Sequence, residues 1–325
     1  MAFRLDPDQR VADSVRDVVR EQLDGALAAL ADPSELGVEK TVHDVRKRCK
    51  RLRGVIRLMR PGMGRRYGAA DAAVADAARE LGGLRDAHAT AATFERLIAA
   101  THGERLSPAA LAGVRDGLAA RVAAAEARPL EPRLARAAER LTAARDVLGS
   151  GSLGGRRAML EGLERTYRRG RGALRTARRD PSAEALHAWR KQAKYGWYHV
   201  TLLRDAAPSV LAPLEDRFDE LCEGLGDEHD LAVLRGTVLA APEEFGGAGS
   251  RDVVELIDAV RADLRDRCIR LGVRLYAEPP GAHGRRMRHL WATWADVGRE
   301  RPVGELDDLA HEPADRPPAL DPAPA

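Results

Sequence analysis

The chain has 325 residues, only 4% of them aromatic, and its 53 lysines and arginines against 50 acidic residues leave a formal net charge of +3. Such a small net charge excludes a uniformly basic nucleic-acid coat, so binding of an anion would require positive charge to be gathered locally. Alanine, leucine, arginine and the acids dominate, and because alanine, leucine, arginine and glutamate are strong helix formers the composition predicts an all-α fold.

Proline and glycine clusters divide the chain into predicted helices. In chain order these span residues 8–31, 36–60, 67–100, 108–128, 133–148, 156–179, 183–205, 208–240 and 252–276, followed by a short helix with Trp291 and Trp294. Residues 149–155 match G-x-G-x-x-G, but no strand precedes them, so we interpret them as a flexible Gly/Ser linker. Residues 299–325 are rich in proline and acids and are predicted to be a disordered acidic tail.

Several kinds of protein are not expected. The amino-terminal residues lack the apolar segment of a signal peptide, and no apolar run approaches the length of a membrane span. Cys49, Cys222 and Cys268 form no C-x-x-C pair, so neither a disulfide framework nor a thiolate zinc site is predicted. Cys49 falls at an apolar helical position, which predicts burial. We therefore expect a cytoplasmic protein with no membrane partner.

One segment recurs at a spacing of 144 residues. Residues 42–50, VHDVRKRCK, align with residues 186–194, LHAWRKQAK. The same offset, without a gap, places Leu81-Gly82 on Leu225-Gly226 and Asp86 on Asp230. We interpret this agreement in register as an internal duplication.

The repeated helix gathers cations on one face. Successive residues of a helix are rotated by about 100°, so one face with an arc of about 100° contains His43, Arg46, Lys47 and Lys50. The second copy of the helix has on the same face His187, Arg190, Lys191 and Lys194. Four of the chain's five lysines lie in these two segments. Like charges at this spacing repel one another, and lysine is a compact point charge that suits a phosphate oxygen. The pattern therefore favours a polyanion site over an ordinary solvated face.

The two motif histidines have two interpretations that do not exclude each other. They could contact phosphate and become cationic when a polyanion binds, since imidazole titrates near neutrality. They could instead make structural hydrogen bonds near the start of each helix. The pair His43-Asp44 resembles a metal-dependent phosphohydrolase dipeptide, but its counterpart is His187-Ala188, so no metal site is expected.

A second group of polar residues is equally unsuited to catalysis. Glu228, His229 and Asp230 are adjacent on a predicted helix and therefore point in different directions. Asp86 and Asp230, which recur in the duplication, are predicted to anchor neighbouring cations.

The H-x-x-R-K-x-x-K helices at His43 and His187, the L-G-x-x-x-D elements at Leu81 and Leu225, and the duplication together resemble the CHAD family, the conserved histidine α-helical domain. The resemblance covers roughly residues 8 to 298. It implies two antiparallel four-helix bundles related by an internal pseudo-twofold duplication, with basic helices around a central cavity. The predicted division is residues 8–148 for the first bundle, 149–155 for the linker, 156–298 for the second bundle and 299–325 for the tail.

The resemblance also implies non-catalytic binding of inorganic polyphosphate and association with polyphosphate granules, with no cofactor and no metal. Carried over position by position, the polyphosphate-facing residues would be His43, Arg46, Lys47, Lys50, Arg53, Arg57, His187, Arg190, Lys191, Lys194 and Tyr198. Residues 195–197, Tyr-Gly-Trp, replace the Arg-Leu-Arg of residues 51–53. The basic helix of the first half is therefore expected to bind polyphosphate more strongly than that of the second half. Many relatives carry a triphosphatase domain, but no E-x-E-x-K signature occurs here and that activity is not expected.

Two other functions remain as alternatives. A phosphoanhydride (polyphosphate) hydrolase would need a cluster of metal-binding carboxylates. An RNA- or DNA-binding protein would need aromatic residues for stacking along the basic helices. The candidates for stacking are Trp189, Tyr195, Trp197 and Tyr198, all in the second half.

Overall fold

The computed structural model describes residues 3–6, 8–101 and 106–297, and every regular element in these residues is a helix. The first half contains α1 (Val11–Ala31), α2 (Pro33–Leu36), α3 (Val38–Leu58), α4 (Arg60–Met63), α5 (Arg66–Glu80), α6 (Gly82–Thr101), α7 (Pro108–Glu126) and α8 (Glu131–Gly149). The second half contains α9 (Arg156–Arg179), α10 (Ala183–Leu203), η1 (Arg204–Ala206), α11 (Pro208–Ala240), η2 (Pro242–Phe245), η3 (Gly247–Gly249), α12 (Ser250–Leu275) and α13 (Pro280–Val297). The all-α prediction is confirmed, and the predicted tail, residues 299–325, lies outside the described residues.

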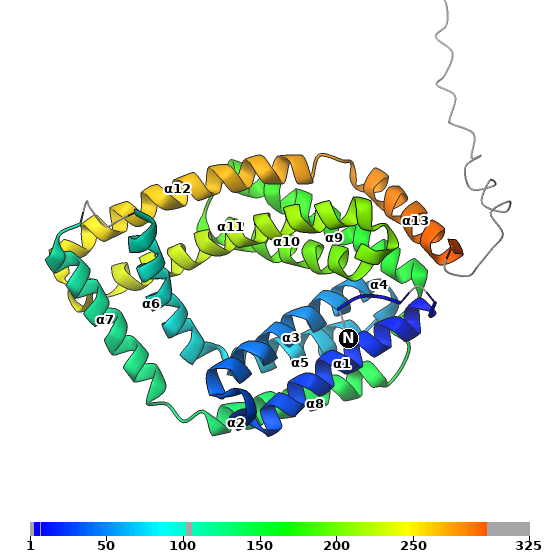
Figure 1. The fold of residues 1–325 in the computed structure, drawn as a ribbon, viewed down its shortest axis with the longest axis horizontal. Coiled ribbons are helices and arrows are strands. Elements are labelled where there is room, and N and C mark those ends of the chain that lie inside the picture. Colours follow the sequence, from blue (N-terminus) through cyan, green and yellow to red (C-terminus); the bar gives the residue numbers. More distant parts are fainter. Residues whose placement is uncertain (1–2, 7, 102–105, 298–325) are drawn as a thin grey trace, which may run out of the picture.

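Four helices of the first half, α1, α3, α5 and α8, pack around one another (Figure 1). The apolar stripe of α3 explains its place in this group, because residues three or four apart face the same side of a helix. Its buried members are Val42, Val45, Cys49, Leu52 and Ile56, which confirms the predicted burial of Cys49. Burial of this stripe leaves the neighbouring basic face of α3 on the outside.

In the second half, α9, α10, α11 and α12 pack together, and α13 lies along α9. Leu186, Trp189 and Ala193 of α10 are buried at helical spacing, and Trp189 is completely covered. Helix α10 also contacts α3, and α9 contacts α3 and α4. The two repeated helices therefore meet directly at the junction between the two groups.

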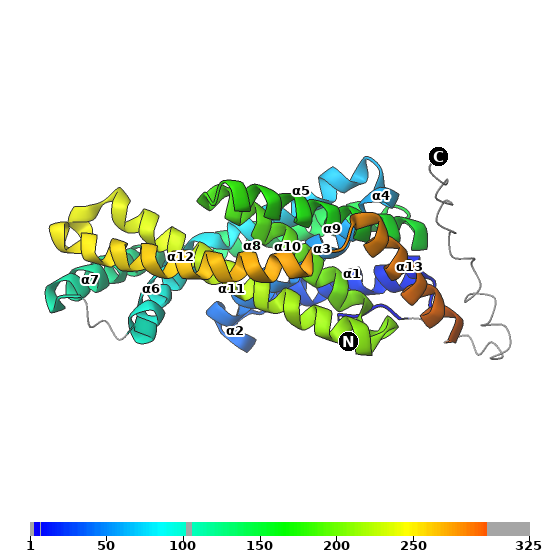
Figure 2. The ribbon, with the colours of Figure 1, turned by 90° about the horizontal axis from the view of Figure 1, so that it is seen from above.

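Helices α6 and α7 leave the first group and pack on α11 and α12 of the second (Figures 1 and 2). They form a separate hydrophobic cluster that includes Phe94, Val114, Leu234, Phe245 and Ile257. This cluster contains residues from both halves of the chain. The hydrophobic cores therefore do not divide along the boundary between the two halves.

The single helix predicted over residues 67–100 is wrong, since α5 ends at Glu80 and α6 begins at Gly82. Two arginines provide donors for carbonyl groups at the end of α5: Arg133 Nε donates to Glu80 O at 2.8 Å, and Arg46 Nη1 to Ala78 O at 2.9 Å. The last carbonyls of a helix lack partners within it, and these side chains supply them. The corresponding Leu225-Gly226 stays inside the continuous α11.

Smaller differences concern the Gly/Pro segments. Ser150 to Gly155 is irregular, yet Leu153 is buried and Gly154 lies against the backbone of Gly62. The last helix begins at Pro280, inside the Pro-Pro-Gly stretch rather than after it, in keeping with the tolerance of proline in a first helical turn. No described helix has the length and apolar character that a bilayer crossing requires.

Candidate functional site

A groove between α3 and α10 brings residues of the two motifs together. Its volume is about 160 Å³, and it is lined by His43, Lys47, Lys50 and Arg51 of α3 and by Lys194, Trp197 and Tyr198 of α10. We call it the α3–α10 groove. His43, Lys47 and Lys50 are exposed, whereas Lys194 is half-buried. Five of the eleven sequence-predicted residues therefore line one groove.

The two helices are in close contact at Gly54 and Tyr198. A Cβ atom at Gly54 would lie 3.0 Å from the Cβ of Tyr198, so a larger residue at this position would require Tyr198 to shift. One residue further along α10, the Nε2 of buried His199 lies 3.0 Å from Gly54 O. Because a carbonyl only accepts, the imidazole donates through Nε2–H and joins the two helices. Burial lowers the pKa of His199 to about 4, so it is neutral at pH 7.

Aromatic rings hold the lysine on the α10 side of the groove. The Nζ of Lys194 lies 3.8 Å from the ring centre of Trp197 and 5.9 Å from that of Tyr198. An ammonium over an aromatic face is attracted to the ring electrons and is held in one place. Tyr198 is buried, and burial raises its pKa, so the phenol stays protonated and contributes a ring rather than a charge.

The arginine of each motif lies against the glycine of an L-G-x-x-x-D element. Arg46 approaches Gly82 and makes an ion pair with Asp86 at 3.7 Å. In the second half, the guanidinium of Arg190 is the nearest group to Gly226. The two sequence elements that recur together are thus in contact in both halves, and neither arginine lines the α3–α10 groove.

Arg53 and Arg57 turn toward α5 instead of the groove. Arg53 donates to both carboxylate oxygens of Asp71, at 2.9 and 3.3 Å, and Arg57 donates to the same carboxylate at 3.2 Å. Arg57 also covers the ring of Tyr195 at 4.3 Å. The sequence does not indicate this pairing, because Asp71 belongs to a different helix.

His187 faces α11 rather than the groove. Its ring stacks on that of His229 with 4.4 Å between the centroids, and its Nδ1 is buried without a hydrogen-bond partner. Burial, together with His229, Lys191 and Arg190, lowers the pKa of His187 to about 4. The stacked ring of His229 is therefore the contact that holds this side of the imidazole, and Lys191 remains exposed nearby.

The carboxylates considered for catalysis each face a cation. Glu228 is buried and accepts from Arg261 at 2.6 and 3.0 Å, and Asp230 pairs with Arg96 at 3.8 Å. The prediction that Asp86 and Asp230 anchor cations is confirmed. Within the described part of the chain, no group of three or more His, Cys, Asp or Glu residues is arranged to hold a metal ion.

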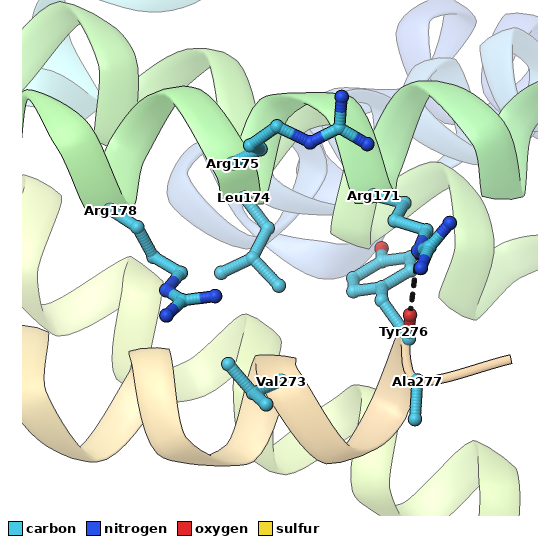
Figure 3. A pocket seen from close by; sticks show the side chains of 7 residues that line it. All are labelled: Arg171, Leu174, Arg175, Arg178, Val273, Tyr276 and Ala277. Carbon is cyan, nitrogen blue, oxygen red and sulfur yellow. Dashed lines mark hydrogen bonds between the residues drawn. The ribbon is translucent and has the colours of Figure 1, made fainter.

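A second pocket, of about 250 Å³, lies between α9 and the carboxyl end of α12 (Figure 3). Its lining consists of Arg171, Leu174, Arg175, Arg178, Val273, Tyr276 and Ala277. Arg171 Nε donates to Tyr276 O at 3.1 Å, directly after the last residue of α12. None of these residues belongs to the repeated motifs, and the floor of the pocket is largely apolar.

Comparison with known proteins points to one family. The profile of the CHAD domain matches residues 17–239, from within α1 to the end region of α11. The crystal structure of the CHAD domain from the plant Ricinus communis is similar, with 21% sequence identity and a TM-score of 0.49. That alignment covers 81% of this chain and 94% of the plant domain. No curated protein matches the sequence.

Proposed function

The chain belongs to the CHAD domain family, and from this premise we propose that it binds inorganic polyphosphate in the α3–α10 groove without catalysing a reaction. The observation that carries the proposal is the meeting of the two lysine-bearing motifs, with Lys47 and Lys50 on one wall and Lys194 on the other. Two walls that approach from different helices can contact successive phosphates of a chain from both sides. Binding of this kind would hold the protein at polyphosphate granules.

The charge distribution supports a polyanion over a single small anion. The chain has a net charge of only +3, yet four of its five lysines belong to the two motifs. Each lysine supplies a compact charge without the planar geometry that an arginine imposes. A flexible chain of identical phosphates needs many such contacts and little directional selectivity, and release of its counterions would provide much of the affinity.

The same proposal includes the pseudo-twofold duplication and a central basic cavity. Residue 54 and its counterpart 144 positions later, Tyr198, are in direct contact. If a twofold axis relates the two halves, equivalent positions that touch must lie on either side of that axis. An axis at this contact would place the α3–α10 groove at the centre of the duplicated unit, and it supports the arrangement that the sequence repeat predicts.

Nucleic acid is the weaker candidate for the polyanion. Stacking requires exposed aromatic faces, but Trp189, Tyr195 and Tyr198 are buried and the face of half-buried Trp197 is covered by Lys194. The groove can therefore contact a nucleic acid only through its phosphates. RNA is therefore the appropriate competitor in a binding assay rather than the expected ligand.

Lysine substitutions test the proposal. The double variant Lys47→Gln/Lys194→Gln should bind long-chain polyphosphate at least about tenfold more weakly, since each charge-assisted contact contributes about 1.5–3 kcal/mol. The slope of log affinity against log salt should fall by about 0.7 for each lysine removed, as for other single-stranded polyanions. The matched control is Lys40→Gln, which removes the one lysine of α3 that lies outside the motif.

Three outcomes would contradict the proposal. Unchanged affinity of the double variant would exclude the groove as the site. Displacement of polyphosphate by an equal charge of RNA would indicate a general nucleic-acid-binding surface. Release of phosphate from polyphosphate in the presence of magnesium, lost in a groove variant, would indicate a hydrolase.

A further inference from the structure

Arginine side chains gather at the carboxyl end of α3, where it meets α4 and α9. Arg57 and Arg60 come from the end of α3 and the start of α4, and Arg165 and Arg169 come from α9. We call these four residues the arginine cluster. In Figure 1 this junction lies toward the end of the molecule opposite α6 and α7. None of the four lines the α3–α10 groove.

A close helix crossing places the two pairs of arginines together. Gly162 of α9 packs directly on the carbonyl of Leu58, which follows Arg57 and lies two residues before Arg60. Residues three and seven positions after Gly162 lie on the same face of α9, since that spacing returns to one side of a helix. Arg165 and Arg169 occupy these positions and therefore extend over the end of α3.

Aromatic rings hold the first pair and link it to the second. Arg57 covers the ring of Tyr195 at 4.3 Å, and Arg60 covers the ring of Tyr67 at 4.5 Å. The ring of Tyr67 also lies near Arg169 and Arg53. Each ring therefore attracts one guanidinium of the first pair and restricts where it can lie.

The cluster has more positive charge than its carboxylates neutralise. Within the described residues, Asp71 is the carboxylate paired with Arg57, and it is shared with Arg53. The acids of α9 near the crossing, Glu161 and Glu164, pair with Arg157 and Arg168 on other positions of the helix. Burial and then repulsion from Arg165, Arg60 and Arg57 lower the pKa of Arg169.

The duplication does not account for this charge. The helix of the first half that corresponds to α9 is α1, and the matching Asp-Pro-Ser turns, at 32–34 and 180–182, set the offset at 148 residues. At that offset Arg165 corresponds to Asp17 and Arg169 to Glu21, so the sign of the charge is reversed. Like charges one helical turn apart are unfavourable on an isolated helix. Only α9 of the second half has this repulsion between its arginines at these positions. We infer that these arginines are present because they bind an anionic ligand.

We propose that the arginine cluster is a second anion site, distinct from the α3–α10 groove, that binds a compact oligophosphate of two or three phosphoryl groups. A terminal phosphoryl group carries about −1.5 to −2 charges near neutral pH, so two of them balance the excess charge of the cluster. Guanidinium groups bind phosphoryl oxygens in pairs through parallel N–H donors. Arginine rather than lysine at this site matches a short, fixed anion, in contrast to the lysines of the groove.

Calorimetric titration with inorganic tripolyphosphate tests the second site. The background is Lys47→Gln/Lys194→Gln, which weakens the groove, so failure of the proposed polyphosphate function and failure of this inference remain distinguishable. Tripolyphosphate should still bind in that background, and adding Arg165→Gln/Arg169→Gln should weaken it at least about tenfold. The matched control, Arg157→Gln/Arg168→Gln, removes the same charge from α9 and should change the affinity less than about twofold.

Thermal unfolding in the absence of phosphate separates a binding defect from a folding defect. The Arg165→Gln/Arg169→Gln protein should melt at the same or a higher temperature than its parent, because repulsion is relieved, and tripolyphosphate should no longer raise that temperature. ATP titrated in parallel identifies the source of the oligophosphate, with tighter binding than tripolyphosphate indicating a nucleotide and weaker binding an inorganic chain. Unchanged tripolyphosphate affinity, or equal losses in the test and control variants, would overturn the inference.

Discussion

His187 is a motif residue that the protein keeps neutral. Burial lowers its pKa to about 4, and the ring of His229 stacked on it, with Lys191 and Arg190, adds to the shift. The pKa of His229 is lowered as well, by burial first and then by Arg190 and Lys191. The stacked pair therefore carries no charge at pH 7, and the second motif is less positive than its residues alone indicate.

A polyphosphate chain that extends beyond the α3–α10 groove to the exposed Lys191 would come near this pair, and its binding should then depend on pH. A polyanion stabilises the imidazolium form, so the pKa of His187 in the complex must rise above its value in the free protein. The complex then takes up a proton, and affinity should increase as pH falls from 7 toward 5. Calorimetry in two buffers with different heats of ionisation would measure this uptake directly.

Substitution separates His187 from other sources of pH dependence. His187→Gln keeps a polar side chain that does not titrate, and it should reduce the proton uptake and flatten the pH profile of affinity. His289→Gln, at an exposed position of α13, is the control and should leave both unchanged. Equal proton uptake by wild type and His187→Gln would show that this imidazole does not take part.

At the scale of helices, the crossing of α3 and α9 depends on one missing side chain. A Cβ at Gly162 would overlap the carbonyl of Leu58, so Gly162→Ala must push the two helices apart. Overpacking of this kind costs about 1–3 kcal/mol. Urea unfolding of Gly162→Ala should show a lower free energy of unfolding by that amount, and the separation should also weaken tripolyphosphate binding at the arginine cluster.

The same helix offers a matched control. A Cβ at Gly172 would meet no atom within 4 Å. Because alanine is about 0.5–1 kcal/mol more favourable than glycine inside a helix, Gly172→Ala should increase the free energy of unfolding. If the two substitutions shift the urea midpoint in the same direction, close contact at Gly162 does not control the crossing.

Helix positions could be predicted from the sequence where proline and glycine mark the ends, as for α9 and α11, both of which agree with the predicted ranges. The break between α5 and α6 could not, because it depends on Arg46 and Arg133, which approach from other helices. Helical periodicity predicts which side chains of α3 share its basic face but does not predict the carboxylate that Arg53 and Arg57 contact. Helical spacing shows which side chains share a face and contains no information about a carboxylate such as Asp71 on a neighbouring helix.

Two residues of the site had no sequence signal of their own. Gly54 and His199 join α3 to α10, but an isolated glycine and an isolated histidine within helical sequence indicate nothing specific. The 144-residue offset places Gly54 on Tyr198, and this relation could have suggested a contact only if the repeated helices were already known to cross. Site geometry of this kind arises from the tertiary packing of the two halves.

The whole molecule is joined at a second place, far from that crossing, by the cluster of α6 and α7 with α11 and α12. Phe245 is completely buried there, and its ring lies against Gly117 of α7. Next to it, Arg121 of α7 pairs with Glu244 at 2.9 Å. Residues from both halves therefore form one hydrophobic unit, which we expect to open cooperatively even though its members are distant in the chain.

Phe245→Ala tests whether this cluster is one cooperative unit. Removing a buried phenylalanine costs about 3–5 kcal/mol, and native-state hydrogen exchange should become faster in α6 and α7 together with the adjoining parts of α11 and α12. The amides of α1, α5 and α8 should keep their protection. Leu141→Ala, at a fully buried position of α8, is the control and should loosen α1, α5 and α8 first. Faster exchange in α11 and α12 with no change in α6 and α7 would mean that the two halves open independently, because a shared core cannot lose one side alone.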